Sequence, residues 1–351
     1  MTKRKNEILK IASVLTCIIC IVPLFECGSS MNGASSKMIL HGKELNCAID
    51  CSSQKYGMQT DFNYEILQNF ANDNHCNVKI TAKTDGCSYA DSLKAGAIDL
   101  AVLPVDEVNE GLCVSKTISD SYVWAVRDEN KSQIKEINRW LSYFENTAEY
   151  SRIKGKYDRT YNPSTRAEKG ITTKTVSPYD PIFKKYAAQL GWDWRMLAAM
   201  AYQESKFAIN TRSHRGAMGL MQVMPGTARV YGIENLLDPE SNVKAGTQHL
   251  KRLQNMFRKQ GLEGEELVKF TLAAYNAGEG RILDCRNFAA SRNADCSKWD
   301  EIVNIIPLMR EESILDEVSV KLGKFQGTET IAYVDNIMSL YGNICSICPE
   351  K

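Results

Sequence analysis

One glutamate in this sequence stands where helical spacing would place an apolar side chain. Asp193 fits a helix N-cap, and the residues that follow it at helical intervals on one stripe are Leu197, Met200, Ala201 and Glu204. A carboxyl group among leucine and methionine side chains loses hydration of its charged form, so its pKa rises and it stays protonated near neutral pH. Glu204 is therefore a candidate general acid.

The ordinary alternative for Glu204 is a residue at a helix end that reaches into water. Its surroundings favour a chemical role, because Ser205 follows directly, a glycine-containing loop comes next, and no acidic residue occurs from Lys206 to Arg229. Glycosidases that add water normally use two carboxylates. A lone acid indicates either a partner from elsewhere in the chain or a mechanism that needs only one carboxylate.

Four short motifs follow one another through the second half of the chain. They are Glu204-Ser205, then a loop with Ser213, GAMGLMQ at 216–222 and MPGTA at 224–228, then AYNAGEGR at 274–281, and finally ETIAYV at 329–334. In this order they resemble the catalytic domains of the soluble-lytic-transglycosylase type. The resemblance covers about Ser177 to Leu340 and implies a lysozyme-like, mostly α-helical fold. It also implies a substrate, peptidoglycan, cut between N-acetylmuramic acid and N-acetylglucosamine.

The resemblance further implies the residues that surround the cleft. Ser213 would hydrogen-bond near Glu204, the groove for the glycan strand would be lined by Gln222 and Met224, and the remaining substrate-binding positions are Tyr275, Asn276 and Tyr333. The two tyrosines would orient the acid or the sugar. Taken singly, each residue also has an ordinary structural explanation, such as capping a turn or filling the core. Glu329 is expected to be a helix-start residue rather than a second acid.

The implied reaction uses one carboxyl group twice. Glu204 would protonate the glycosidic oxygen and then, as carboxylate, take the proton of the muramic acid C6 hydroxyl while that oxygen closes on C1. The product end is a 1,6-anhydro sugar, and neither a cofactor nor a metal is required. Two alternatives stay open: a lysozyme-type muramidase that hydrolyses the bond, and an inactive peptidoglycan-binding scaffold, against which the intact Glu204 argues.

The first residues have the pattern of an export signal. Four basic residues lie within positions 3–10, and the apolar run Ile11–Phe25 is shorter than the roughly 20 residues of a membrane-spanning helix. The run ends in LFECGSS, which resembles a bacterial lipoprotein signal with Cys27 as the lipidated residue, although Glu26 departs from the usual small residue. The alternatives are an ordinary signal peptide cut a few residues later and an uncleaved anchor. We expect a periplasmic protein, lipid-anchored to the outer membrane of a Gram-negative bacterium.

Charge and cysteine content exclude some functions. The formal net charge is +1, and removing residues 1–26 takes it to −1, so there is no electrostatic case for nucleic-acid binding. Nine of the twelve cysteines follow Cys27, which fits an oxidising compartment and leaves at least one thiol without a partner within the chain. Their spacing lacks paired CxxC motifs, which argues against a metal site. Cys285 and Cys296 bracket a polar stretch that a disulfide could close.

Residues 37–165 have the pattern of an α/β domain. Strands are expected at 44–49, 77–81, 99–103 and 123–126, with helices at 62–72 and 89–95 and a closing helical segment at 131–157. Such βαβαβ order predicts a parallel sheet. FNYEIL at 62–67 and LKAGAIDLA at 93–101 resemble the first lobe of periplasmic solute-binding proteins. The fold class expected for the whole chain is therefore α+β and multidomain.

The second lobe of that family is missing from the pattern, because only about twenty residues separate Leu103 from Val123. Small ligands are held between two lobes, so we expect a docking or spacer module rather than a ligand sensor. A linker is expected at residues 166–177 within a Pro- and Thr-containing stretch, and the catalytic domain at 178–351. Its helices are expected at 181–190, ending at Gly191, and at 247–259 and 267–276, with Gly278 and Gly280 breaking the last.

Overall fold

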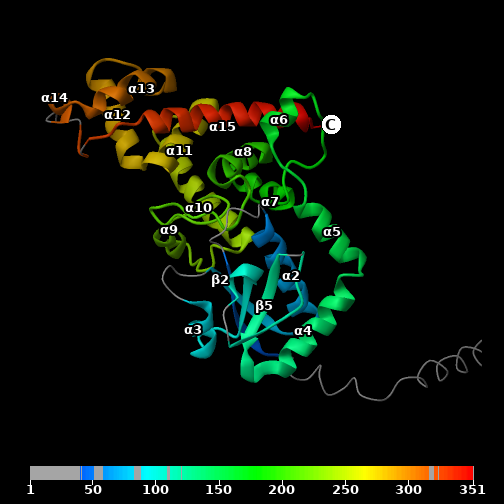
Figure 1. The fold of residues 1–351 in the computed structure, drawn as a ribbon. Helices are drawn as coiled ribbons and strands as arrows, with labels where there is room; N and C mark the ends of the chain where they lie inside the picture. The colour runs from blue at the N-terminus through cyan, green and yellow to red at the C-terminus, as the bar shows by residue number, and fades with distance from the viewer. Residues whose placement is uncertain are drawn as a thin grey trace, which may run out of the picture.

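The structure is a computed structural model, and it describes residues 40, 42–50, 58–82, 88–108, 111–119, 121–315, 320–322 and 324–350. An α/β part comes first, and a helical part follows it (Figure 1). The expected leader and Cys27 lie outside the described residues. Among the helices that are described, none combines the length and the apolarity that crossing a membrane requires.

The α/β part is built on a five-stranded sheet. Its strands are β1 (Glu44–Ile49), β2 (Asn77–Ala82), β3 (Leu100–Pro104), β4 (Leu112–Val114) and β5 (Tyr122–Arg127), in the spatial order β2-β1-β3-β5-β4. The expected parallel pairing is confirmed for β1 with β2 and with β3. It is wrong for β5, which runs antiparallel to both β3 and β4, and β4 is a strand that the sequence pattern did not reveal.

Four helices accompany the sheet: α2 (Gln59–Asp73), α3 (Tyr89–Lys94), α4 (Lys131–Phe144) and α5 (Ala148–Tyr157). The apolar face of α4 contributes Trp140, which lies 5.1 Å between ring centroids from Phe70 of α2 and stacks near Trp124 of β5. Between β3 and β5, the described residues form only a 3₁₀ turn, η3 (Val105–Glu107), and β4. The chain thus returns to the sheet without a second lobe in its described part.

The second part is helical throughout. Its elements are α6 (Pro163–Glu168), α7 (Asp180–Leu190), α8 (Trp194–Ser205), α9 (Pro225–Val230), α10 (Pro239–Arg258), α11 (Gly264–Ala277), α12 (Glu279–Ser291), α13 (Trp299–Ile305), η5 (Ile306–Arg310), α14 (Glu312–Leu315) and α15 (Thr328–Ile347). Helix α8 is the central element, because residues Met196–Ala201 are buried all round and three of them are alanines. Small side chains let α7 and α15 approach it closely (Figure 1).

Several details of the helical part differ from expectation. Residues 163–168 form α6, which lies beside the end of α15 (Figure 1), so the expected linker stretch is partly ordered helix. Asn162 caps α6 by accepting from the Thr165 N–H at 3.1 Å, a signal hidden among loop-like residues. Gly278 ends α11 as expected, whereas Gly280 lies inside α12 instead of breaking a helix.

The expected Cys285–Cys296 disulfide is wrong, because both residues are free thiols, as are all seven cysteines in the described part of the chain. Cys285 is fully buried in α12, and the Cys296 carbonyl accepts from the Arg286 Nε–H at 2.8 Å. Burial raises the pKa of the Cys285 thiol to about 12, which makes it unreactive at neutral pH. No group of three metal-ligating side chains occurs within the described ranges.

Helix α2 joins the two parts. Tyr64 donates to Asp238 Oδ1 at 2.9 Å, and Asp238 itself caps α10 by accepting from the Ser241 N–H at 2.8 Å. One turn earlier on α2, Asp61 accepts from the Tyr179 hydroxyl and from the Ile209 N–H, the latter at 3.2 Å. Tyr64 and Asp61 of α2 both bind residues of the helical part. The α/β part is therefore docked on the helical part through polar contacts as well as through a shared apolar core.

Candidate active site

Helix α8 places Glu204 in its last turn. Asp193 begins the helix as expected, because its carboxylate accepts from the Arg195 N–H at 2.9 Å. The helix ends sharply: Lys206 and Phe207 both adopt left-handed backbone angles, with φ of 54° and 69°. Such angles are unusual for residues with a side chain and persist only where the surroundings enforce them. The chain therefore turns away directly after Glu204.

Glu204 is half-buried and has one tyrosine as its partner. The Tyr333 hydroxyl of α15 donates to Glu204 Oε1 at 2.5 Å. Burial raises the pKa of Glu204 to about 7, and the Tyr333 hydrogen bond opposes this rise only in part. Neither cause is a second carboxylate, so the shift does not come from the paired acids of a hydrolytic glycosidase.

A second tyrosine completes the immediate surroundings of Glu204. Tyr275 of α11 donates to the Met221 carbonyl at 2.8 Å, and burial together with the charge of Glu204 raises its pKa well above the usual range. The next residue, Asn276, is exposed and accepts from Thr330 Oγ1 at 2.8 Å, which ties α11 to the start of α15. The structure thus brings together Glu204, Tyr275 and Tyr333 from three helices.

The loop between α8 and α9 is held by its own side chains. Ser205 Oγ donates to the Leu220 carbonyl at 2.9 Å. Gln222 Nε2 donates to the carbonyls of Thr211 and Gly219 at 2.9 and 3.0 Å, and the Gln222 backbone is left-handed with φ of 46°. Ser213 Oγ accepts from the Ala217 N–H at 3.0 Å. These bonds fix the loop in one shape against the end of α8.

The loop residues therefore differ in whether their side chains are used in hydrogen bonds within the loop or are exposed to a ligand. Ser213 and Gln222 make bonds within the loop, so they shape it, and the bond between Ser213 and the region of Glu204 stays a prediction. Met224 is 43% exposed at the start of α9, where an apolar side chain is open to a ligand. Glu329 lies exposed in the first turn of α15, as expected of a helix-start residue.

Asn242 of α10 supports this loop and was missed by sequence reasoning. Its Oδ1 accepts from the Met221 N–H at 2.9 Å, and its Nδ2 donates to the carbonyls of Met218 and Leu236 at 2.8 and 2.9 Å. Gly219 has φ of +76°, and a Cβ there would lie 2.1 Å from Asn242 Nδ2. The glycine is required by backbone angle and by space, which gives the GAMGLMQ motif a physical cause.

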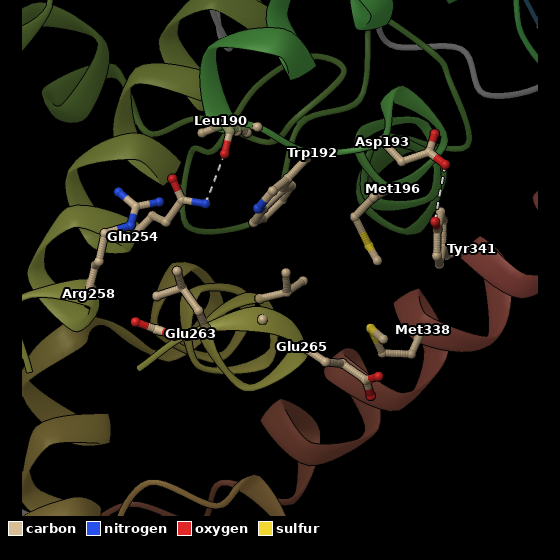
Figure 2. A pocket seen from close by; sticks show the side chains of 14 residues that line it. Leu190, Trp192, Asp193, Met196, Gln254, Arg258, Glu263, Glu265, Met338 and Tyr341 are labelled. Carbon is tan, nitrogen blue, oxygen red and sulfur yellow. Dashed lines mark hydrogen bonds between the residues drawn. The ribbon is translucent and has the colours of Figure 1, made fainter. Parts of the chain in front are cut away.

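A cavity of about 600 Å³ lies at the other end of α8 (Figure 2). Its lining includes Trp192, Met196, Gln254 and Met338, with Met196 and Met338 pointing toward one another, but not Glu204. Glu204 is eight residues further along α8 than Met196, roughly 12 Å at the helical rise. This cavity is therefore separate from the acid.

Part of the chain matches a known domain family. Residues 181–297 match the family model of the transglycosylase SLT domain. This stretch begins at α7 and contains Glu204, the loop that follows it, Asn242 and Tyr275. This part of the chain is therefore similar to a transglycosylase SLT domain.

The chain is similar to proteins named membrane-bound lytic murein transglycosylase F. It is 30% identical over 224 residues to that of Desulfosudis oleivorans, covering 62% of this chain and 48% of the relative. It is 29% identical over 277 residues to that of Pseudomonas fluorescens, covering 74% and 56%. The chain thus spans about half the length of the curated relatives it matches.

Among solved structures, the chain resembles the 70 kDa soluble lytic transglycosylase from Escherichia coli. The identity is 27% and the TM-score 0.38, over 51% of this chain and 25% of that one.

Proposed function

We propose that this protein is a lytic transglycosylase that cleaves the bond between N-acetylmuramic acid and N-acetylglucosamine in peptidoglycan and leaves 1,6-anhydro ends. The observation that carries the proposal is the state of Glu204, a half-buried carboxyl group with a raised pKa and a tyrosine as its partner. The SLT domain match and the names of the relatives support the same chemistry.

The geometry supports a reaction in two steps. With a pKa of about 7, a large share of Glu204 is protonated at neutral pH and can donate to the glycosidic oxygen as the bond breaks. The resulting carboxylate keeps the Tyr333 hydrogen bond, which is stronger to a charged acceptor than to a neutral one. It then removes the proton from the C6 hydroxyl while that oxygen bonds to C1, so no water enters the product.

We assign the remaining positions by their contacts. Tyr333 stabilises the carboxylate form of Glu204, and Tyr275 holds the loop at Met221 beside it. Ser213 and Gln222 preserve the shape of the groove, while Met224 offers an apolar contact to a sugar ring. Asn276 joins α11 to α15 and so fixes the two tyrosines relative to one another.

We propose further that residues 37–165 form a reduced, solute-binding-like unit that acts as a docking or spacer module, with residues 166–177 leading into a catalytic domain at 178–351. The five-stranded sheet and the direct return from β3 to β5 support this division. We also keep the proposal of an exported protein, lipid-anchored through Cys27 at the outer membrane and acting on periplasmic murein. The similarity to proteins named membrane-bound lytic murein transglycosylase F supports a location at a membrane.

Digestion of purified murein tests the reaction. Mass spectrometry should find muropeptides lighter by one water than hydrolysis products, each with an anhydro end. Products that have taken up water would instead indicate a lysozyme-type muramidase, and the absence of products would indicate a binding scaffold. Glu204→Gln is the matched inactive variant, and Glu329→Gln, which alters an exposed glutamate in the first turn of α15, is the control expected to retain activity.

A further inference from the structure

A cavity of about 590 Å³ lies between α5, the segment before α7, and the start of α7. Its volume falls within the roughly 300 to 1,000 Å³ typical of small-molecule sites. Five basic side chains line it, and they are Arg152, Lys156, Arg159, Lys174 and Lys184. The lining contains a single acidic residue, Asp180. In a chain with 43 basic and 42 acidic residues, this is a strong local excess of positive charge.

Asp180 does not neutralise that excess, because its carboxylate is used within its own turn. It is 6% exposed and accepts from the N–H groups of Val176 and Ser177 at 2.8 Å each, and from the Ser177 hydroxyl at 2.6 Å. These three donors hold it at the base of the cavity. It therefore has a structural role, and of the five cations Lys184 is the one whose charge lowers its pKa against the effect of burial.

Two of the five cations are already paired. Glu65 of α2 accepts from Lys156 at 2.7 Å and from Arg152 at 2.8 Å, and Arg152 also pairs with Glu149 at 2.6 Å. These pairs fasten α5 to α2. The positive charge available to a ligand must therefore come from the other three residues.

Arg159, Lys174 and Lys184 form no ion pair with any described carboxylate. Lys184 lies over the Trp194 ring at 4.7 Å, a contact that keeps its charge. The three come from separate segments, namely the residues after α5, the chain before α7, and α7 itself. Scattered surface lysines are ordinarily just solvated, but here folding gathers three unpaired cations around one hollow, although like charges repel.

We propose that this cavity binds a phosphate-bearing ligand. A compact ligand that meets several cations at once needs more than one negative charge on one centre. A phosphomonoester carries about −1.5 to −2 near pH 7, whereas a carboxylate carries one charge. Arg159 can meet two phosphate oxygens with its planar fork, and Lys174 and Lys184 supply point charges. The phosphomonoester can belong to a free small molecule or to phosphatidic acid, a phospholipid whose headgroup is itself a phosphomonoester.

Binding is tested on the full-length protein with two probes. Glycerol 3-phosphate, followed by calorimetry at low and at moderate salt, tests the free small molecule. Vesicles that contain phosphatidic acid, with phosphatidylcholine vesicles as the comparison without net charge, test the headgroup in a flotation assay. Saturable binding of either probe supports the proposal and identifies the source of the phosphate. No saturable binding of either probe to the wild-type protein overturns it.

Variants decide whether the cavity is the site. Arg159→Ala, Lys174→Ala and Lys184→Ala should each weaken binding roughly 5-fold, and the triple variant on the order of 100-fold. The matched controls are Lys154→Ala, an exposed cation of α5 outside the lining, and Lys185→Ala, the neighbour of Lys184 that pairs with Glu240. Lys174→Arg keeps the charge and should retain binding, which separates loss of charge from loss of folding.

Equal weakening by the controls would mean that diffuse surface charge, rather than this cavity, attracts the probe, and would overturn the proposal. The inference does not depend on the proposed reaction. Glu204→Gln should bind the phosphate probe as the wild type does while failing to cleave murein. A Glu204→Gln protein that loses phosphate binding would contradict the separation of the two sites.

Discussion

Two carboxyl groups in this protein have a similarly raised pKa and different surroundings. Burial raises the pKa of both Glu204 and Asp61 to about 7, and each accepts a hydrogen bond from a tyrosine hydroxyl. Glu204 accepts from Tyr333 of α15, and Asp61 accepts from Tyr179 where the α/β part meets the helical part. A raised pKa alone therefore does not distinguish a catalytic acid from a structural carboxyl group.

The two carboxyl groups differ in their accessibility to a ligand. Asp61 is 1% exposed, it also accepts from the Ile209 N–H, and its Oδ2 atom is buried with no hydrogen-bond partner. No ligand can reach it without separating the two parts. Glu204 is half-buried next to a loop that carries the exposed Met224. The same physical shift thus belongs to a docking contact at one place and to the proposed proton transfer at the other.

The sharpest test of the comparison replaces each carboxyl by its amide. Glu204→Gln keeps the shape of the side chain but has no acidic proton to donate, so murein cleavage should fall by at least the ~10² to 10⁴ that general acid catalysis supplies. Asp61→Asn should stay within a few-fold of the wild type, because its amide oxygen can still accept from Ile209. Release of anhydro-muropeptides measures both. Comparable losses in the two variants would remove the distinction.

The second test uses stability against pH. The pKa of Asp61 is raised from 3.8 to about 7, so between these values the folded state binds the proton more tightly than the unfolded chain. Asp61 therefore favours the folded state at low pH, and this contribution is lost as pH rises toward 7, with a slope of up to about 1.4 kcal/mol per pH unit. Asp61→Asn should flatten the stability profile of chemical denaturation from pH 4 to 8. An unchanged slope would show that Asp61 does not titrate in this range.

The third test removes the tyrosine hydroxyl group that donates to each of the two carboxyl groups. The Tyr333 hydrogen bond lowers the pKa of Glu204, so Tyr333→Phe should raise that pKa and move the alkaline limb of the activity profile to higher pH. Loss of a hydrogen bond to a charged group should also slow cleavage about 10- to 100-fold. Tyr179→Phe is the matched change at the other carboxyl group and should reduce stability without moving the profile. A profile shift in Tyr179→Phe alone would reverse the assignment.

The smallest effect is expected within the loop. Ser213→Ala removes the acceptor of the Ala217 N–H, a bond worth about 0.5 to 1.5 kcal/mol, and should reduce kcat/KM by a few-fold. Kinetics on soluble glycan strands measure this change. A loss as large as that of Glu204→Gln would show that Ser213 contacts the reacting groups directly.

Local sequence patterns predicted the helices and strands whose bounds are set by residues close together in the chain. Strand β1 has the expected bounds, and α8 begins after Asp193 and ends just beyond Glu204. Periodicity also placed Glu204 on an apolar stripe, from which burial and a raised pKa followed. These features depend on spacing within about ten residues, which the sequence displays directly.

The missed features depend on contacts between distant segments. The direction of β5 is set by the chain's return from β4, which residue types do not encode. In the sequence, Asn242 has the pattern of an ordinary polar helix residue, and its contact with Met221 arises only because α10 packs against the loop. Asp61 likewise has the pattern of a surface aspartate, and its contact with Tyr179 arises only when the two parts pack together. Their roles appear only after packing.

Because Glu204 and its partner Tyr333 lie far apart in the chain, they are synthesised at different times. Tyr333 lies 129 residues after Glu204. During synthesis at about 5 to 20 residues per second, the helix with the glutamate emerges many seconds before the tyrosine whose hydrogen bond lowers its pKa. The order of the motifs along the chain thus delays this hydrogen bond until α15 has been made.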